Sequence, residues 1–322
     1  MDIHKRSLQI GAAAVVCALA LRLLSNSVAL EDVPLMDATA MQILLFLETG
    51  RIVPQPEFQP EVQPPVQTAP TEAAALPVFS DEDARFVQVA AIASLEVDAR
   101  TLLQQPLNWD LTGDEPAVLI LHSHATEGYA DTENYRSSDP EENMVSIGAH
   151  LAQKLEGAGV HVIHDTKLHD LPSYDDAYTS ARSSIAGYLA QYPSICLVLD
   201  LHRDATVDAT GAQYGQTVAT KDGNAARLML VMGTELGGQA HPLWQENLAL
   251  AAKLQAVLEK QTPGLCKDIQ LRSSRFNQDL SPGALLVEVG AAGNSREEAL
   301  AAVELLGDAI LSLAQGTAAQ SE

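Results

Sequence analysis

The chain has 322 residues, and its 42 acidic residues outnumber its 19 lysines and arginines, which gives a formal net charge of −23. A chain this acidic is not expected to bind nucleic acid, because phosphate backbones are bound by clustered cations. Hydrophobic residues make up 47% of the chain, which is enough for a large core and excludes overall disorder. Only three cysteines are present, so a disulfide scaffold is excluded as well.

The first 30 residues differ from the rest in charge and hydropathy. Two basic residues precede an apolar run over 8–24, and acidic residues follow from Glu31 onward. This order predicts an N-terminus in the cytosol and an exported remainder. Residues 1–30 are therefore predicted to form a single-pass membrane anchor, with Arg22 reaching the outer interface. The alternative is a cleaved signal peptide with small residues at the cleavage site, 27–29.

Residues 31–79 are predicted to be a membrane-proximal segment followed by a linker. Seven of the 16 prolines lie between Pro54 and Pro77. Proline fixes φ and removes a backbone donor, so this stretch is predicted to be an extended spacer without a core. At about 3 Å per residue, such a spacer gives the following domain reach away from a membrane.

A helical lead-in is predicted over 80–114. Ser80 is a suitable N-cap, three acidic residues follow it, and an apolar stripe continues to about Gln105. The remaining 115–317 are assigned to one catalytic domain.

Short apolar runs alternate with amphipathic segments in this domain. The runs predict strands, and apolar residues spaced three or four apart predict helices. In chain order, strands are expected over 118–121, 160–163, 195–201, 228–232 and 284–289, and helices over 141–156, 174–189, 243–258 and 296–313. The alternation predicts an α/β fold in which helices flank both faces of a mostly parallel sheet.

Side chains suited to catalysis gather at three of the predicted strands. His122 and His124 follow the first strand, with Glu127 three residues further on. His202 lies at the end of the third strand, and Glu288 lies in the last strand. Because the carboxyl ends of parallel strands share one edge of a sheet, these side chains are expected to meet in one crevice.

Two histidines, one carboxylate and an open fourth position form a common ligand set for catalytic zinc. Bound zinc supplies a nucleophilic water near neutral pH, and Glu288 is predicted to accept its proton and pass it to a leaving amine. Burial in an apolar strand is expected to raise the pKa of Glu288, although strand alternation also allows it to face solvent. A nucleophilic Ser123 is a weaker alternative, because no Gly-x-Ser-x-Gly turn surrounds it.

The polar loop 277–283 precedes the strand that carries Glu288. Its residues Asn277 and Gln278 are candidates for substrate binding. As the entry to that strand, the loop starts at the opposite edge of the sheet unless it folds over.

Three stretches of this domain resemble the stage II sporulation protein P family. They are Val-Leu-Ile-Leu-His-Ser-His-Ala-Thr-Glu-Gly-Tyr at 118–129, Leu-Asp-Leu-His-Arg-Asp-Ala at 199–205 and Asn-Gln-Asp-Leu-Ser-Pro-Gly-Ala-Leu-Leu-Val-Glu-Val-Gly at 277–290. The resemblance covers roughly 115–315. In the first stretch, His-Ser-His and Glu-Gly-Tyr stand where the family commonly has His-Thr-His and Glu-Ser-Tyr.

The resemblance implies a fold like that of the zinc N-acetylmuramoyl-L-alanine amidases. It implies a peptidoglycan hydrolase that cuts the amide between N-acetylmuramic acid and L-alanine during engulfment of the forespore. The residues that it implies are zinc ligands at His124, Glu127 and His202, a catalytic carboxylate at Glu288 and a nearby substrate or orienting residue at Arg203.

The choice between His122 and His124 as ligand stays open at this level. His124 lies further past the strand and nearer Glu127, so it is the preferred ligand. His122 is then expected to bind substrate or to support the ligands.

The resemblance also implies a setting. The family is credited with cleavage of peptide cross-links, and sporulation proteins D and M of stage II are its membrane partners. The catalytic domain is expected outside the cytosol, between forespore and mother cell.

Two alternative functions stay open. Endopeptidase activity and amidase activity cannot be distinguished from the sequence. A non-catalytic wall-binding scaffold is a third hypothesis, disfavoured because neither Cys196 nor Cys266 is placed to serve as a fourth ligand.

Overall fold

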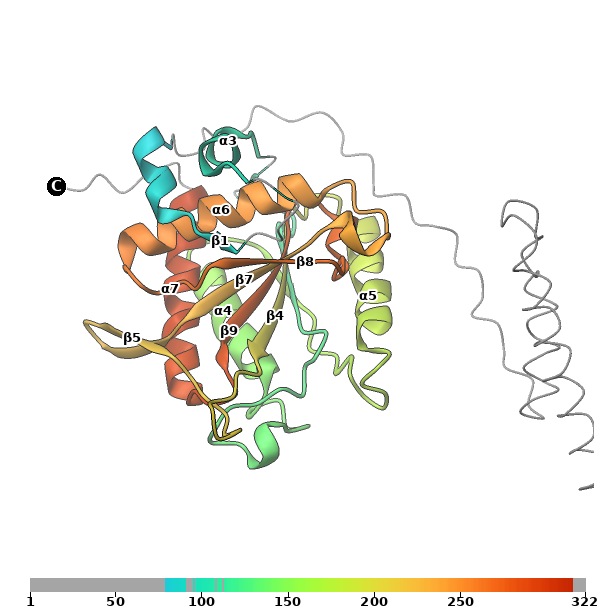
Figure 1. Ribbon diagram of the computed structural model, residues 1–322. Helices are drawn as coiled ribbons and strands as arrows, with labels where there is room; N and C mark the ends of the chain where they lie inside the picture. The colour runs from blue at the N-terminus through green and yellow to red at the C-terminus, as the bar shows by residue number, and fades with distance from the viewer. Residues whose placement is uncertain (1–78, 91–94, 96, 108, 112, 315–322) are drawn as a thin grey trace, which may run out of the picture. The chain divides into compact units, whose positions relative to one another are not determined.

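The computed structural model describes residues 79–314, apart from 91–94, 96, 108 and 112 (Figure 1). The predicted anchor, 1–30, lies outside the described residues, and so does the linker up to residue 78. Among the residues that are described, none of the helices combines the length and apolar character needed to cross a bilayer.

Seven strands form one sheet in the order β1-β8-β7-β9-β4-β2-β3 (Figure 1). Five neighbouring pairs are parallel and the β7–β9 pair is antiparallel, so the predicted mostly parallel sheet is confirmed. The strands are β1 (Val89–Ala90), β2 (Val118–Leu121), β3 (Val162–His164), β4 (Leu197–Asp204), β7 (Leu228–Gly233), β8 (Ile269–Arg272) and β9 (Ala284–Ala291). A separate hairpin joins β5 (Thr217–Thr220) to β6 (Gly223–Ala226).

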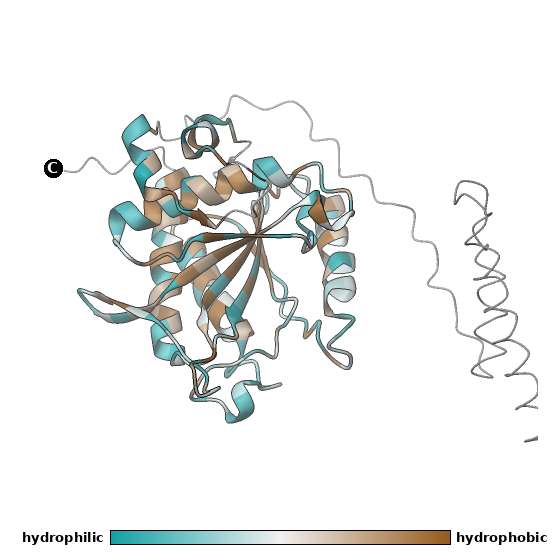
Figure 2. Cartoon of the chain, in the orientation of Figure 1, coloured by the Kyte–Doolittle hydropathy of each residue, from teal (hydrophilic) through white to brown (hydrophobic). Residues whose placement is uncertain are grey.

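Helices cover both faces of this sheet, as predicted. The α-helices are α3 (Ala99–Gln104), α4 (Met144–Gly157), α5 (Ala177–Gln191), α6 (Trp244–Gln261) and α7 (Arg296–Ala314). Apolar residues of α3, α4, α6 and α7 share the larger core with one face, whereas those of α5 share a smaller core with the other. Figure 2 shows the strands and the inward sides of these helices as the hydrophobic parts of the fold.

The continuous apolar run of β2 follows from burial on both faces. Its four residues are fully buried. Val118 and Ile120 belong to the larger core, and Leu119 and Leu121 belong to the core beneath α5. A strand sandwiched in this way has no solvent-facing positions, which is why it shows no polar alternation.

The lead-in, which was predicted to be helical, is only partly so. It contains the 3-10 helix η2 (Asp81–Phe86), then β1, then the short helix α3. Ser80 is the N-cap residue of the first of these, as predicted, and its backbone amide and hydroxyl both donate to the Asp83 carboxylate, at 2.7 and 2.9 Å. The helical spacing is overridden by strand pairing, because β1 lies parallel to β8 and the Ile269 amide donates to the Gln88 carbonyl at 2.8 Å. The lead-in therefore contributes an edge strand to the sheet.

Two strands of the site run further than predicted. The prediction ended the third strand at residue 201 and the last at residue 289, but β4 continues to Asp204 and β9 to Ala291. Their ladder continues past His202 and Glu288 with a register shift before Asp204. Polar residues interrupt the apolar run there, but the backbone pairing continues. β8 and the β5–β6 hairpin were not predicted.

Candidate metal centre

His202 and Glu288 lie opposite each other across the β4–β9 pair. Side chains alternate between the two faces along a strand. Val198 and Ala284, which have the same parity as His202 and Glu288 respectively, pack into the core beneath α5. Both functional side chains therefore project from that face of the sheet, near the carboxyl ends of their strands.

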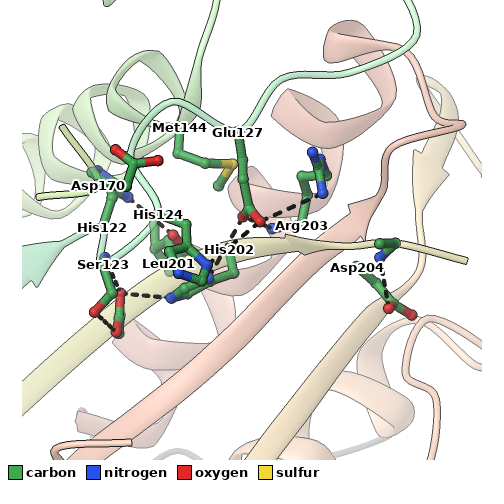
Figure 3. Close-up of polar contacts among 12 residues, drawn as sticks. His122, Ser123, His124, Glu127, Met144, Asp170, Leu201, His202, Arg203 and Asp204 are labelled. Atoms are coloured by element: carbon green, nitrogen blue, oxygen red, sulfur yellow. Dashed lines mark hydrogen bonds and ion pairs between the residues drawn. The ribbon is translucent and has the colours of Figure 1, made fainter. Parts of the chain in front are cut away.

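The loop after β2 brings two further side chains to His202 (Figure 3). His124 Nδ1 lies 3.7 Å from Glu127 Oε1, and His202 Nδ1 lies 3.5 Å from Glu127 Oε2. Ligand atoms of all three residues lie within 4.8 Å of one another. Ligands placed about 2.1 Å from a tetrahedral zinc are themselves about 3.4 Å apart. The side chains of His124, Glu127 and His202, called the metal group below, thus fit a shared metal ion.

Asp200 holds His202 from the side away from Glu127. The Asp200 Oδ1 atom lies 3.0 Å from His202 Nε2 and accepts a hydrogen bond from the Ser123 amide at 2.8 Å. The Asp200 Oδ2 atom accepts a hydrogen bond from the Ser123 hydroxyl at 2.5 Å. This contact leaves Nδ1 of His202 facing Glu127. Asp200 was not predicted to belong to the site, although an aspartate two residues before a histidine on a strand lies on the same face and is a usable signal.

The charges around His202 favour a cation at this point. Burial lowers the pKa of His202, but Asp200 and Glu127 outweigh burial and raise that pKa well above its ordinary value. Burial raises the pKa of Glu127, but His202 and Arg203 outweigh burial, so the net pKa of this carboxyl is lower than its ordinary value. Two carboxylates that stabilise positive charge between them suit a divalent cation.

Glu288 differs from the other acidic groups of the site. Its Oε2 is buried and has no hydrogen-bond partner among the described residues. Burial raises the pKa of Glu288 to about 8, with His202 opposing that effect. A carboxyl group tuned close to neutral pH can both accept and return a proton.

Arg203 supports the site from behind. Its Nε donates to the Gly128 carbonyl at 2.9 Å, its Nη2 donates to the Tyr135 carbonyl at 3.0 Å, and its backbone amide donates to Glu127 Oε2 at 3.2 Å. Arg203 is buried, so these contacts fix the loop that carries Glu127. These contacts place Arg203 where it can orient Glu127, and its role stays a prediction.

The structure does not bring His122 to the metal group. Its Nδ1 donates to the Leu201 carbonyl at 3.1 Å, and its Nε2 lies 3.0 Å from His164 Nε2. The ring packs beneath Gly148 of α4, on the face opposite α5. It is fully buried, and burial lowers the pKa of His122 to about 3. Both ring nitrogens are engaged, which gives His122 a structural position.

The two amides of the polar loop lie apart from the metal group. Gln278 is buried, and its side chain bonds to the Gly233 amide and the Val231 carbonyl at the end of β7. Asn277 donates to the Tyr178 carbonyl at 2.8 Å. The loop does fold over the α5 face, but only Asn277 is linked to the site, through Tyr178.

Two tyrosines near the start of α5 line one side of the metal group. The Tyr174 ring stacks on His124 with centroids 4.3 Å apart, and its hydroxyl lies 3.5 Å from His124 Nδ1. The Tyr178 ring lies parallel to His202 at 6.2 Å. Neither residue was predicted to belong to the site. Tyr174 precedes α5 by three residues and Tyr178 is the second residue of α5, so two aromatic side chains at the entry to this helix are the signal that identifies them.

Comparison with known proteins identifies the family. The profile of the family described as Stage II sporulation protein P (SpoIIP) matches residues 59–311, well over half of the chain. The chain belongs to the stage II sporulation protein P family. The Stage II sporulation protein P of Bacillus subtilis (strain 168) is 26% identical over 234 residues, which cover 67% of this chain and 55% of that protein. The chain thus spans about half the length of this curated relative.

Two solved structures are also similar to this member of the family, at low identity. The N-acetylmuramoyl-L-alanine amidase AmiC2 of Nostoc punctiforme is 16% identical, with 62% of this chain and 98% of that chain covered and a TM-score of 0.38. The N-acetylmuramyl-L-alanine amidase Ami1 from Mycobacterium smegmatis is 13% identical, with 65% and 100% covered and a TM-score of 0.39. The chemistry of the site is therefore inferred from this chain's own residues.

The three stretches that resemble the SpoIIP family come together in the fold. The first, 118–129, supplies β2 and the loop with His124 and Glu127. The second, 199–205, forms the end of β4, which pairs with both β2 and β9. The third, 277–290, forms the loop over α5 and most of β9. The three stretches thus form the adjacent strands β9, β4 and β2 and the site at the carboxyl ends of these strands.

Proposed function

We propose that this chain is a zinc-dependent peptidoglycan hydrolase that cleaves the amide between N-acetylmuramic acid and the L-alanine of the stem peptide. The observation that carries the proposal is one juxtaposition. Ligand atoms of His124, Glu127 and His202 converge within 4.8 Å, and Glu288, with an unpartnered buried oxygen, stands beside His202 in the strand register. Membership of the SpoIIP family supports a role in sporulation.

Each residue of the site has its own role in the proposed amide hydrolysis. His124, Glu127 and His202 would hold Zn²⁺, which would supply Lewis acidity and a water nucleophile at neutral pH. Glu288 accepts the proton of the attacking water and delivers it to the nitrogen of the scissile amide. The water oxygen bonds to the carbonyl carbon as the carbon–nitrogen bond breaks, so N-acetylmuramic acid keeps a carboxylate and the stem peptide leaves with a free L-alanine amine.

Two alternatives share the same residues. An endopeptidase that cuts peptide cross-links uses the same amide chemistry and differs only in which bond is presented. A non-catalytic scaffold requires a closed structural metal site with four protein ligands. Neither Cys196 nor Cys266 is in the ligand group, and the Cys196 thiol contacts the Asp110 carbonyl at 3.3 Å instead. Among the described residues the ligand group has three members, which leaves a coordination position for water and favours catalysis.

Replacement of the candidate proton carrier tests the proposal. Glu288→Gln keeps the shape of the side chain and removes its ability to accept a proton, so activity on purified peptidoglycan is expected to fall about 10²- to 10⁴-fold while zinc content is unchanged. Products are identified by mass spectrometry: stem peptides with a free L-alanine amine establish the amidase, and split cross-links establish the endopeptidase.

The matched control is Glu297→Gln, an exposed carboxylate on α7. It is expected to retain wild-type activity. Full activity of Glu288→Gln, or zinc-independent cleavage by the wild type, contradicts the assignment.

We further propose that residues 1–30 tether the chain to the cell membrane with the catalytic domain outside the cytosol, alongside stage II sporulation proteins D and M. The charge asymmetry around the apolar run 8–24 supports this proposal. A chain without residues 1–30 is expected to leave the membrane fraction. Its retention there to the same extent as the whole chain contradicts the tether.

A further inference from the structure

A cavity of about 310 Å³ lies between the start of α5 and the loop that follows β8. Its lining includes Tyr178 and Arg182 from α5, and Arg275, Phe276 and Asn277 from the loop. None of the three candidate metal ligands lines it. The cavity is therefore a separate compartment beside the metal group.

Tyr178 is the wall that the cavity shares with the metal group. Its ring lies parallel to His202 at 6.2 Å between centroids and meets Phe276, on the cavity side, at 5.8 Å. Two residues of an extended peptide span about 7 Å. A peptide whose reacting amide lies at the metal group thus reaches the cavity within a few residues.

The cavity carries more cationic than anionic groups. Arg182 binds Asp279 through both terminal nitrogens, at 2.9 and 2.8 Å. Arg275 reaches the same carboxylate with only Nη1, at 3.4 Å. Two guanidinium groups thus share one carboxylate, which leaves one net positive charge. Among the described residues, none accepts a hydrogen bond from Nε or Nη2 of Arg275, so both remain donors available to a ligand.

The loop that presents Arg275 is held in place. Phe276 and Asn277 both have positive φ, 51° and 59°, a conformation that is unfavourable for non-glycine residues and that persists only where surrounding contacts hold it. The hydrogen bond from Asn277 to the Tyr178 carbonyl ties the loop to α5. The cation is thus fixed relative to the wall of the metal group, as a binding site requires.

We propose that this cavity binds a free carboxylate of the peptidoglycan stem peptide through Arg275, with Arg182 and Asp279 as its support. The inference rests on the proposed function, because it takes the stem peptide as the substrate of the neighbouring metal group. A guanidinium pairs with a carboxylate through two parallel hydrogen bonds, which matches the donors that Arg275 retains. On a chain with a net charge of −23, a cationic cavity selects the anionic end of a substrate.

Binding without catalysis tests this assignment directly. The full-length chain, stripped of metal, is titrated calorimetrically with the tripeptide L-alanyl-γ-D-glutamyl-L-lysine and with the same peptide whose carboxylates are carboxamides. We expect the carboxamide form to bind at least tenfold more weakly, as loss of a charge-assisted hydrogen bond requires. Equal affinity for the two forms, or no binding of the carboxylate form, overturns the proposal.

Variants locate the carboxylate at Arg275. Arg275→Gln is expected to bind the carboxylate peptide at least tenfold more weakly and to discriminate little between the two forms, whereas Arg275→Lys restores part of the difference. Asp279 keeps its bidentate partner Arg182 in both variants, so the fold is preserved. Arg100→Gln, on the exposed side of α3, is the matched control and binds as the wild type does. Wild-type discrimination by Arg275→Gln overturns the proposal.

Kinetics separate this inference from the proposed function. On peptidoglycan, Arg275→Gln is expected to raise KM at least tenfold with a smaller change in kcat. A wild type that discriminates between the two peptides but hydrolyses nothing contradicts the proposed function and leaves the carboxylate site standing. Hydrolysis with an unchanged KM in Arg275→Gln contradicts the carboxylate site alone.

Discussion

At the scale of single residues, Asp200 sets the orientation of the metal group. It lies 3.0 Å from His202 Nε2 and is itself fixed by the amide and hydroxyl of Ser123. Asp200→Asn removes the charge that orients and polarises the imidazole. Zinc affinity is expected to fall about 10- to 100-fold, as measured by competition with a chromophoric chelator.

A second buried aspartate–histidine pair provides the control for this variant. Asp165 Oδ2 lies 3.2 Å from His169 Nε2, and neither residue belongs to the metal group. Asp165→Asn therefore removes the same kind of contact and is expected to leave zinc affinity unchanged. An Asp200→Asn chain with wild-type zinc affinity shows that Asp200 does not orient the ligand.

Single residues of the site differ in how far the sequence specifies them. His124, Glu127 and His202 meet because parallel strands end at one edge, and that rule is visible in the chain. The roles of Asn277 and Gln278 depend on how a loop folds back over the sheet, and no local pattern encodes that path. Gln278 instead completes the hydrogen bonding at the end of β7.

At the scale of elements, a glycine of α4 makes room for the histidine pair below it, in which His122 is fully buried and His164 is partly buried. A Cβ atom added to Gly148 would lie 2.4 Å from His122 Nε2 and 2.6 Å from His164 Nε2. Gly148→Ala forces these rings or the helix to move, and a loss of about 1–3 kcal/mol in the free energy of unfolding is expected. Urea unfolding of the purified chain measures it.

A glycine in α5 gives the opposite result and serves as the control. A Cβ at Gly187 meets nothing within 4 Å, and the position is exposed. Gly187→Ala gains helix propensity alone, so stability is expected to rise by about 0.5–1 kcal/mol. Equal effects of the two substitutions contradict the close approach of α4 to the histidine pair.

The elements of the fold were predictable where burial leaves a periodic pattern. The apolar runs of β2, β4, β7 and β9 and the stripe of α4 are such patterns, and each was located within a few residues. Two further features were not predicted. The first is the pair of short strands β1, at the edge of the sheet, and β8, its neighbour. The second is the antiparallel direction of the β7–β9 pair, which depends on pairing between distant segments. Their partners decide these features, so local sequence does not reveal them.

At the scale of the whole molecule, a buried lysine joins the lead-in to the body of the fold. Lys253 of α6 donates to the Leu103 carbonyl of α3, and its ammonium lies 5.1 Å from the Phe79 ring centroid. The residue is only 4% exposed, and burial lowers the pKa of Lys253 to about 8. The folded chain therefore releases this proton at a lower pH than the unfolded chain, in which an ordinary lysine has a pKa near 10.4.

This difference predicts how stability depends on pH. Between about pH 8 and pH 10 the unfolded chain binds more protons than the folded chain, so the Lys253 contribution to the free energy of unfolding rises with pH. Relative to Lys253→Met, the wild type is expected to gain on the order of 2–3 kcal/mol across this interval, measured by urea unfolding at pH 7, 8, 9 and 10. Lys221→Met, at a side chain 90% exposed, is the control and is expected to keep a constant difference from the wild type. A constant difference for Lys253→Met as well means that the ammonium between α6 and the lead-in is hydrated in the folded chain, and that α3 does not close over it.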